Sequence, residues 1–176
     1  MKKNIVLTGF MGTGKTLIGN IVAEKLNMEF IDTDKIIEER EKDRIARIFQ
    51  VKGEEYFRKL EEKVINEICK KENCVIATGG GAIIRKKNYN NMKKSGIIIC
   101  LEAEPSIILL RTSSTKERPL LLKNKDAIST IRYLINSRKK YYDKADYKID
   151  TTSLSPEKVS EKIIEIWKKE NEKNRN

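Results

Sequence analysis

A glycine-rich segment near the beginning of the chain has the residue types and the spacing of a phosphate-binding loop. Residues 9–16, GFMGTGKT, match the pattern G-x-x-x-x-G-K-[ST]. In such a loop the backbone N–H groups curl around phosphate oxygens, and the following helix directs its positive end at them. Lys15 is then placed to reach the β- and γ-phosphates, and the Thr16 hydroxyl to ligate Mg²⁺. The segment predicts a nucleoside triphosphate site between a strand and a helix.

Two carboxylates at the end of the next predicted strand suggest a second site. Asp32 and Asp34 are two residues apart in the run FIDTD. Side chains with this spacing on a strand share one face, so we expect both to point into a cleft at the carboxyl end of the strand, where open α/β sheets bind ligands. One would order waters around Mg²⁺, and the other would accept a proton from a hydroxyl group. The alternative is a structural role in which Asp34 caps the next helix.

A second glycine loop, residues 78–81 with the sequence TGGG, follows the third predicted strand. Three consecutive glycines are costly in backbone entropy, so a simple turn explains them poorly. Their backbone amides are suited to contact an anion or hydroxyl groups.

Residue counts exclude several kinds of chemistry. The chain has no histidine, so it holds no Ser-His-Asp or Cys-His pair, no HExxH zinc site and no imidazole base. The three cysteines, Cys69, Cys74 and Cys100, are too few for a thiolate zinc site, and their odd number suits a reducing compartment. We expect buried, apolar cysteines in a cytoplasmic protein.

The chain is strongly basic, with 37 Lys and Arg against 26 Asp and Glu and a formal net charge of +11. Lysine supplies 27 of these cations in scattered KK and EK pairs, which is typical of a solvated surface, whereas a nucleic-acid-binding stripe would cluster arginines with aromatic residues. The charge would also concentrate small polyanionic ligands near a cleft. No apolar run approaches the roughly 18 residues of a transmembrane helix. We therefore expect small-molecule ligands, and neither a nucleic acid nor a membrane as a partner.

The order of the predicted elements indicates a doubly wound α/β domain. Five short apolar runs alternate with longer amphipathic stretches, and their continuous apolar character suggests a parallel sheet buried on both faces. We expect strands at 4–8, 29–31, 75–78, 96–101 and 147–150, and helices at 16–26, 34–50, 54–71, 105–111, 127–142 and 156–169. Because no repeat, linker or composition shift interrupts this order, residues 1–176 are predicted to form a single domain.

Residues 112–124, TSSTKERPLLLKN, do not fit the alternation. A loop of this length in a compact domain is usually functional or disordered. Its position after the fourth strand and helix suggests a mobile lid over a site at the sheet end, and an ordinary surface loop is the alternative.

A nucleotide site by itself leaves the phosphate acceptor open. A GTPase would carry DxxG and NKxD segments, neither of which is present, and a domain of this size lacks the bulk of a motor ATPase. A small-molecule kinase needs a second pocket for a hydroxyl acceptor and a cover that excludes water. The segments described above supply candidates for both.

Taken in order, these segments resemble the shikimate kinase family. The motifs are GFMGTGKT, FIDTD, IFQVKGEEYFRKLE, VIATGGGAI, RTSSTKERPLL and RKKYY, and they extend over essentially the whole chain. The resemblance implies a monomeric P-loop kinase of the adenylate-kinase-like group with a five-stranded parallel sheet, substrate-binding helices at about 34–61 and a lid at about 112–124. It implies transfer of the γ-phosphate of ATP to the 3-hydroxyl of shikimate, on the route to chorismate and the aromatic amino acids.

The resemblance also assigns roles to matching residues. Lys15, Asp34 and Arg118 are the implied catalytic residues, with Asp34 on the acceptor hydroxyl and Arg118 brought in by the lid to meet charge on the phosphoryl group. Arg58 and Arg138 are implied to hold the shikimate carboxylate, which a planar guanidinium fits in a bidentate manner. The remaining implied contacts are Gly79, Gly80, Gly81, Phe49 and Phe57 for shikimate, Gly12, Thr13, Gly14, Thr16, Leu17 and Arg111 for ATP, and Thr16 with Asp32, through water, for Mg²⁺.

The chain departs from the family pattern at three places. Arg47 stands where the family often has an acidic residue, Thr13 stands where Ala or Ser is usual, and residues 152–155 lack the basic residue that the family frequently places near the adenine. Two other functions remain as alternatives. One is a different P-loop small-molecule kinase, such as a gluconate kinase, and the other is a basic NTP-dependent module that binds RNA.

Overall fold

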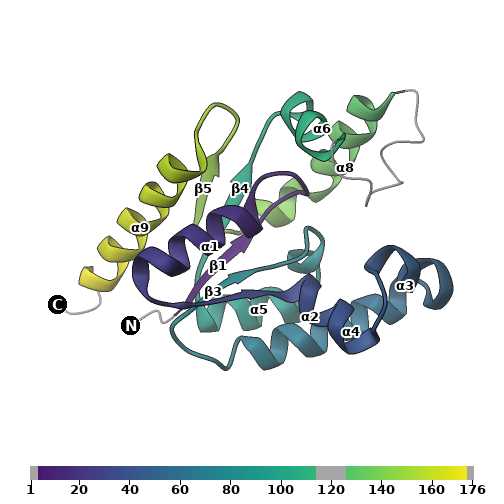
Figure 1. Ribbon diagram of the computed structural model, residues 1–176, viewed down its shortest axis with the longest axis horizontal. Helices are drawn as coiled ribbons and strands as arrows, with labels where there is room; N and C mark the ends of the chain where they lie inside the picture. Colours follow the sequence, from purple (N-terminus) through teal and green to yellow (C-terminus); the bar gives the residue numbers. More distant parts are fainter. Residues whose placement is uncertain (1–3, 114–125, 174–176) are drawn as a thin grey trace.

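Five parallel strands form one sheet in the computed structural model, which describes residues 4–113 and 126–173 (Figure 1). The strands are β1 (Asn4–Thr8), β2 (Glu29–Asp32), β3 (Cys74–Ala77), β4 (Gly96–Glu102) and β5 (Tyr147–Asp150). Their order is β2-β3-β1-β4-β5, and every pairing is parallel. The predicted α/β fold with a five-stranded parallel sheet is confirmed.

Helices cover both faces of this sheet (Figure 1). They are α1 (Lys15–Leu26), α2 (Thr33–Glu41), α3 (Ile45–Lys52), α4 (Glu54–Ile68), α5 (Lys86–Ser95), α6 (Pro105–Ser113), α8 (Ala127–Tyr142) and α9 (Pro156–Lys173), with a short 3₁₀ turn, η1 (Ala82–Ile84). Strand side chains alternate between two cores. Ile5 and Leu7 pack with α1 and α9, whereas Val6 packs with the helices from α2 to α5.

Two helical segments differ from the sequence prediction. The sequence predicts one helix over 34–50, but the chain turns at Lys42, where φ is 53°, and α3 starts anew. The Glu38 carboxylate of α2 accepts the backbone N–H of Ile45 at 3.0 Å and so caps α3, a non-local bond that periodicity does not reveal. The helix α5 is missing from the prediction because Asn88 and Met92 are its buried residues, too few to produce an apolar period.

The strand order brings three loops to one edge of the sheet. β1 lies between β3 and β4, and β3 lies between β1 and β2. The glycine loop at 9–16 follows β1, Asp32 ends β2, and the TGGG loop follows β3. The backbone N–H of Thr78 donates to the Leu7 carbonyl at 3.0 Å, which continues the pairing of β1 and β3 to the start of both glycine loops.

Within residues 4–113 and 126–173, no helix combines the length and the apolar character needed to cross a lipid bilayer.

Asn4 fixes the beginning of the central strand, and its removal provides a test of the fold. Its buried side chain donates to the Lys71 carbonyl at 2.7 Å and accepts the Cys74 N–H at 2.9 Å. Because Asn4→Ala leaves the buried Cys74 N–H and the part-buried Lys71 C=O without their partners, we expect the free energy of unfolding to fall by about 1–3 kcal/mol in denaturant titrations. The control is Asn90→Ala on the exposed side of α5, which should change it by less than about 0.5 kcal/mol. Equal stability of the two variants would contradict this role of Asn4.

Candidate active site

The loop between β1 and α1 is curled and held by its own side chains. Gly14, the N-cap of α1, has φ 95°, a left-handed conformation that favours glycine. The Lys15 ammonium donates to the carbonyl oxygens of Gly9 and Phe10, both at 2.9 Å. The Thr13 hydroxyl donates to the same Phe10 carbonyl at 2.8 Å. Lys15 therefore spans the loop, and Thr13, which departs from the usual Ala or Ser, adds a bond that stiffens it.

Asp32 joins this loop to the start of α2. Its Oδ2 accepts the Thr16 hydroxyl at 2.9 Å, and its Oδ1 accepts the backbone N–H groups of Asp34 at 3.0 Å and Lys35 at 3.4 Å. Asp32 is thus the N-cap of α2, and Asp34 lies in the first turn of that helix. The spacing of the two carboxylates predicts that they share one face of a strand. They do not, because the strand ends at Asp32 and Asp34 belongs to the helix that follows. The hydroxyl of Thr16 and the carboxylate of Asp32 are oxygen donors of the kind that suits Mg²⁺.

The TGGG loop is enclosed by charged side chains from α2 and α4. A methyl group on Gly79 would lie 2.7 Å from Asp34 Oδ1 and 2.9 Å from Glu61 Oε1. A methyl group on Gly81 would lie 2.6 Å from Nη2 of Arg58. Glycine is therefore required at both positions for these groups to approach the loop. The structure brings Asp34 and Arg58 together on this loop, and it adds Glu61.

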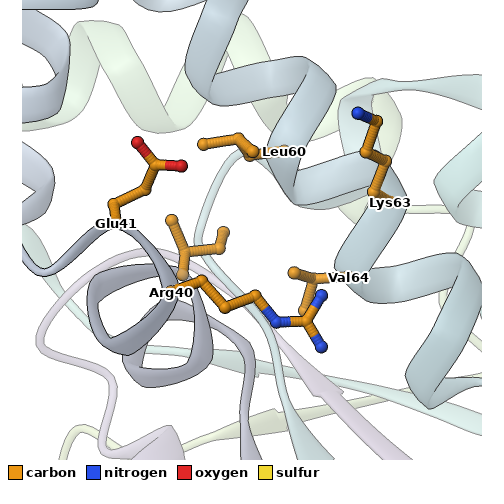
Figure 2. Close-up of a pocket in the computed structure, with 6 residues that line it drawn as sticks. Arg40, Glu41, Leu60, Lys63 and Val64 are labelled. Carbon is orange, nitrogen blue, oxygen red and sulfur yellow. The ribbon is translucent and has the colours of Figure 1, made fainter.

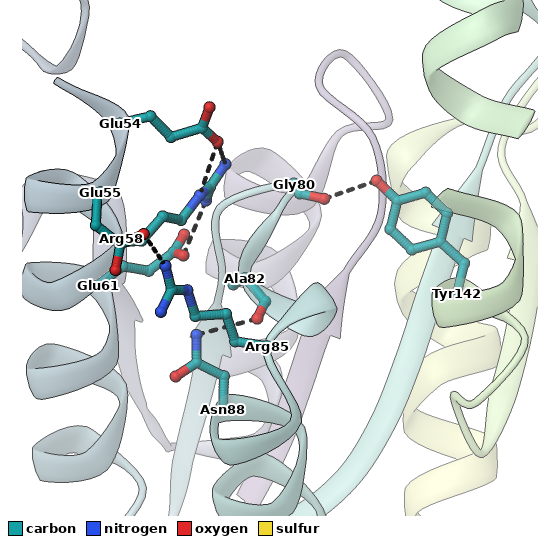
Figure 3. Close-up of polar contacts among 9 residues, drawn as sticks. All are labelled: Glu54, Glu55, Arg58, Glu61, Gly80, Ala82, Arg85, Asn88 and Tyr142. Carbon is teal, nitrogen blue, oxygen red and sulfur yellow. Dashed lines mark hydrogen bonds and ion pairs between the residues drawn. The ribbon is translucent and has the colours of Figure 1, made fainter. Parts of the chain in front are cut away.

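Arg58 is held by two carboxylates of its own helix (Figure 3). Its Nη1 lies 2.9 Å from Oε2 of Glu61, and its Nη2 lies 3.3 Å from Oε1 of Glu54. The Glu61 side chain is fully buried, whereas 68% of the Glu54 side chain is exposed. Burial raises the pKa of Glu61 from 4.5 to about 7, although the nearby charge of Arg58 acts in the opposite direction. The negative charge of Asp34 raises the pKa of Glu61 further, and the positive charge of Arg85 lowers it.

Two aromatic rings, those of Phe49 and Phe57, pack against the Arg58 guanidinium. The ring centroids of Phe49 and Phe57 are 4.6 Å apart, and the Arg58 guanidinium carbon lies 5.9 Å and 5.3 Å from them. Cation–π attraction at this range adds to the two ion pairs in fixing the guanidinium. Phe57 belongs to the core with 3% exposure, and Phe49 is half-buried.

Arg138 approaches the same loops from α8. Its guanidinium carbon lies 5.5 Å from the centre of the Phe10 ring, which belongs to the phosphate-binding loop. A methyl group on Gly80 would lie 3.1 Å from the Gly9 carbonyl oxygen, so the two glycine loops touch through their backbones. In the described part of the chain no carboxylate pairs with Arg138, in contrast to Arg58.

The amides of the TGGG loop point to a ligand. Among the described residues, no acceptor is found for the N–H groups of Gly79, Gly80 and Gly81, although Gly79 and Gly81 are buried. Buried N–H groups are nearly always paired in proteins. The two buried donors and the half-buried N–H of Gly80, with Arg58 against Gly81, form a site for an anion or for hydroxyl oxygens.

Arg111 lies at the other end of the phosphate-binding loop. Its guanidinium donates to the Thr151 carbonyl at 2.8 Å and hydroxyl at 3.0 Å, and to the Gly12 carbonyl at 3.4 Å. The buried Thr151 thus connects Arg111 to the end of β5. Leu17 on α1 has 58% exposure, and Arg47 pairs with Asp43 at 3.2 Å on the surface.

Three of the residues that build these contacts were not singled out in the sequence: Glu61, Thr151 and Tyr142, whose hydroxyl donates to Gly80. A signal existed for Glu61, because it stands within the buried helical stripe of Phe57, Val64 and Ile65, where an acidic residue is out of place. Arg118 and residues 114–124 of the predicted lid lie outside the described residues.

A small concave pocket between α2 and α4 is lined by none of the predicted site residues (Figure 2). Its lining is formed by Ile37, Arg40, Glu41, Leu60, Lys63 and Val64.

Comparisons with known proteins identify the family and the fold. The family model "Shikimate kinase" matches residues 11–168. The shikimate kinase of Caldicellulosiruptor saccharolyticus is 49% identical over 164 residues, which cover 93% of this chain and 95% of that protein. A structure of shikimate kinase from Acinetobacter baumannii in complex with shikimate is 37% identical, with a TM-score of 0.88 over 93% of this chain and 92% of that one. A gluconokinase structure from Sinorhizobium meliloti, at 13% identity over 98% of this chain and 97% of that one with a TM-score of 0.61, shows a similar fold alone.

The raised pKa of Glu61 predicts a pH-dependent stability. Between pH 4.5 and about 7 the folded chain keeps a proton on Glu61 that the unfolded chain releases. The resulting stabilisation is present below pH 4.5 and is lost as the pH rises through about 7, with a slope of at most about 1.4 kcal/mol per pH unit. Glu61→Gln should remove this contribution to the slope. The measurement is the free energy of unfolding of the variant and of the unmodified chain at each pH, and the difference between the two should change between pH 4.5 and about 7.

The matched control is Glu54→Gln, which removes the exposed partner of the same arginine. It should keep the pH dependence of the unmodified chain. If Glu61→Gln and Glu54→Gln have the same pH profile, Glu61 does not titrate in this range.

Proposed function

The chain belongs to the shikimate kinase family, and from that premise we propose how its own residues phosphorylate shikimate with ATP. Its activity is that of a shikimate kinase in the route to the aromatic amino acids. The observation that carries the residue assignments is the cluster of Asp34, Arg58 and the TGGG loop, whose three glycine amides have no acceptor among residues 4–113 and 126–173, against the phosphate-binding loop. Transfer then proceeds from the γ-phosphate to the 3-hydroxyl of shikimate, with ADP as the second product.

At the donor side, the curled loop at 9–16 binds the ATP phosphates, with contacts from Gly12, Thr13 and Gly14. Lys15 leaves the loop carbonyls it now contacts and bonds the phosphate oxygens, which are stronger acceptors because they are charged. The Thr16 hydroxyl and, through water, Asp32 would hold Mg²⁺. When bound, this ion neutralises charge on the β- and γ-phosphates.

At the acceptor side, Asp34 bonds the hydroxyl that attacks the phosphoryl group. Phosphoryl transfer with a loose transition state needs little base strength, so the main contribution of Asp34 is to orient the hydroxyl. The absence of histidine leaves carboxylates and the phosphate itself as proton acceptors. The position of Asp34 over Gly79, on a capped helix start next to Thr16, supports this role.

In this proposal the shikimate carboxylate lies between Arg58 and Arg138 and accepts hydrogen bonds from the amides of the TGGG loop, which have no acceptor among the described residues. Arg58 is prepared for this contact by Glu54, Glu61 and the two phenylalanine rings, so little side-chain entropy is lost on binding. The net charge that attracts the carboxylate is carried by Arg138, which has no carboxylate partner in the described residues. Phe49 and Phe57 limit the space available to the ring.

The remaining assignments rest on the family. We propose that Arg118, in the lid predicted over 112–124, meets the transferring phosphoryl group, and that Arg111 and Leu17 lie near the adenosine. Thr112 and Ser113, the first two residues of that predicted lid, belong to the end of α6. We propose a cytoplasmic monomer that consists of one domain and uses Mg²⁺ with ATP.

One experiment compares acceptors. ADP release is followed in a coupled assay with shikimate, gluconate and AMP, each with ATP and Mg²⁺. Shikimate should be the efficient acceptor, and efficient use of gluconate would instead support the gluconate-kinase alternative. RNA affinity that is strong and falls steeply with salt would support the RNA-binding alternative.

Asp34→Asn preserves the shape of the side chain and removes its charge. We expect kcat to fall by a factor of about 10² or more, because the hydroxyl group of shikimate that attacks the phosphoryl group no longer has a carboxylate to orient it. ATP affinity, measured by calorimetry, should stay unchanged. Asp43→Asn, at an exposed ion pair between α2 and α3, is the control and should retain full activity. Nearly normal turnover of Asp34→Asn would rule out both roles of this carboxylate.

Arg58→Lys tests the carboxylate contact, because lysine keeps the charge but not the bidentate fork. We expect KM for shikimate to rise by about one to two orders of magnitude while KM for ATP changes little. Arg138→Lys should act in the same direction. The control is Arg40→Lys, which alters an exposed ion pair with Glu67. A shikimate analogue without the carboxylate should be a poor acceptor, and efficient phosphorylation of this analogue would contradict the contact.

A further inference from the structure

Tyr142 connects α8 to the TGGG loop. It is the last residue of α8, and it is 3% exposed within the core beneath the sheet. Its hydroxyl donates to the Gly80 carbonyl at 2.7 Å, across 62 residues of chain (Figure 3). The carbonyls on either side of Gly80 accept N–H groups from the adjoining turn η1 at 3.0 Å and 3.1 Å. The hydrogen bond to the Gly80 carbonyl thus comes from a residue distant in the sequence, whereas the carbonyls of Gly79 and Gly81 accept bonds from nearby backbone N–H groups.

This bond orients one particular peptide group. The peptide unit is planar and trans, so its C=O and N–H point in opposite directions. With the Gly80 carbonyl directed at Tyr142, the N–H of Gly81 points away from α8. That N–H has no acceptor within residues 4–113 and 126–173, and the Arg58 guanidinium lies against the same residue.

The same helix end also carries Arg138. Arg138 and Tyr142 are four residues apart, and residues with this spacing are neighbours on a helix surface. Arg138 lies over the Phe10 ring, and Gly80 touches the backbone of the same loop. One turn of α8 therefore contacts both glycine loops.

The Tyr142 hydroxyl remains a donor at physiological pH. Burial raises the pKa of Tyr142 to about 12, with the charge of Arg138 acting in the opposite direction. The bond to Gly80 therefore persists at neutral pH.

We propose that Tyr142 is a positioning residue for the acceptor: its hydroxyl fixes the Gly80–Gly81 peptide so that the Gly81 N–H, together with Arg138, faces the shikimate carboxylate. The proposal rests on the proposed function, because it names the support of that carboxylate site. Tyr142 itself touches neither substrate nor phosphate in this assignment.

The test is Tyr142→Phe, which retains the ring and removes the hydroxyl. KM for shikimate should rise about tenfold, the size expected for one buried hydrogen bond, with KM for ATP and kcat nearly unchanged. Tyr141→Phe is the matched control, since it removes the same atom from the adjacent residue, whose ring contacts Lys140 and Lys144. It should leave all three constants unchanged.

A conservative replacement distinguishes positioning from packing. 4-Aminophenylalanine at position 142 carries an N–H donor at the same ring position and should restore KM for shikimate toward that of the unmodified enzyme. Unchanged KM for shikimate in Tyr142→Phe, parallel changes in both KM values, or no rescue by the amino variant would overturn the proposal. If the unmodified enzyme does not phosphorylate shikimate, the proposed function itself fails, and that result is separate from the behaviour of Tyr142.

Discussion

The parallel pairing of β1 with β3 and of β3 with β2 is the constraint on which the site depends. In a parallel sheet neighbouring strands end at the same edge, so the loops that follow them are brought together without further design. Here these loops are the phosphate-binding loop, the start of α2 with Asp32 and Asp34, and the TGGG loop. The hydrogen bond from Thr78 to Leu7 carries the pairing to the first residue of the TGGG loop.

The missing side chain of glycine sets the distance between the two sites. Gly80 lies against the backbone of the phosphate-binding loop, and Gly79 and Gly81 lie against Asp34, Glu61 and Arg58. A side chain at Gly80 would press on the backbone of the phosphate-binding loop, and one at Gly79 or Gly81 would displace the Asp34, Glu61 or Arg58 side chain. Phosphoryl transfer is catalysed chiefly by positioning and electrostatics, so this backbone spacing is itself part of the catalytic arrangement.

The buried pair of Arg58 and Glu61 shows how the fold prepares charge for a ligand. Removing two charges from water is costly, and such a pair is weak evidence for stability. Its benefit here is a guanidinium held in one geometry by carboxylates and rings, whereas Arg138 carries the charge that remains without a carboxylate partner in the described residues. Each arginine thus contributes a different property to one anion site.

The sequence by itself determined the elements that depend on local pattern: the phosphate-binding loop, the five strands and the α/β class. The edge strands β2 and β5 are only partly buried, unlike the three central strands. Asp34 was identifiable from its place beside Asp32 at the end of the second strand, whereas Arg58 and Arg138 were identifiable through the family resemblance. The tertiary structure decided what depends on contacts across the chain. These contacts brought Glu61 and Tyr142 to the TGGG loop. The structure also decided where two helices begin, because Asp32 caps α2 and Glu38 caps α3 through the local path of the backbone. Periodicity reports which residues share a face of one helix or strand, whereas it specifies neither these caps nor the distant residues that packing makes adjacent.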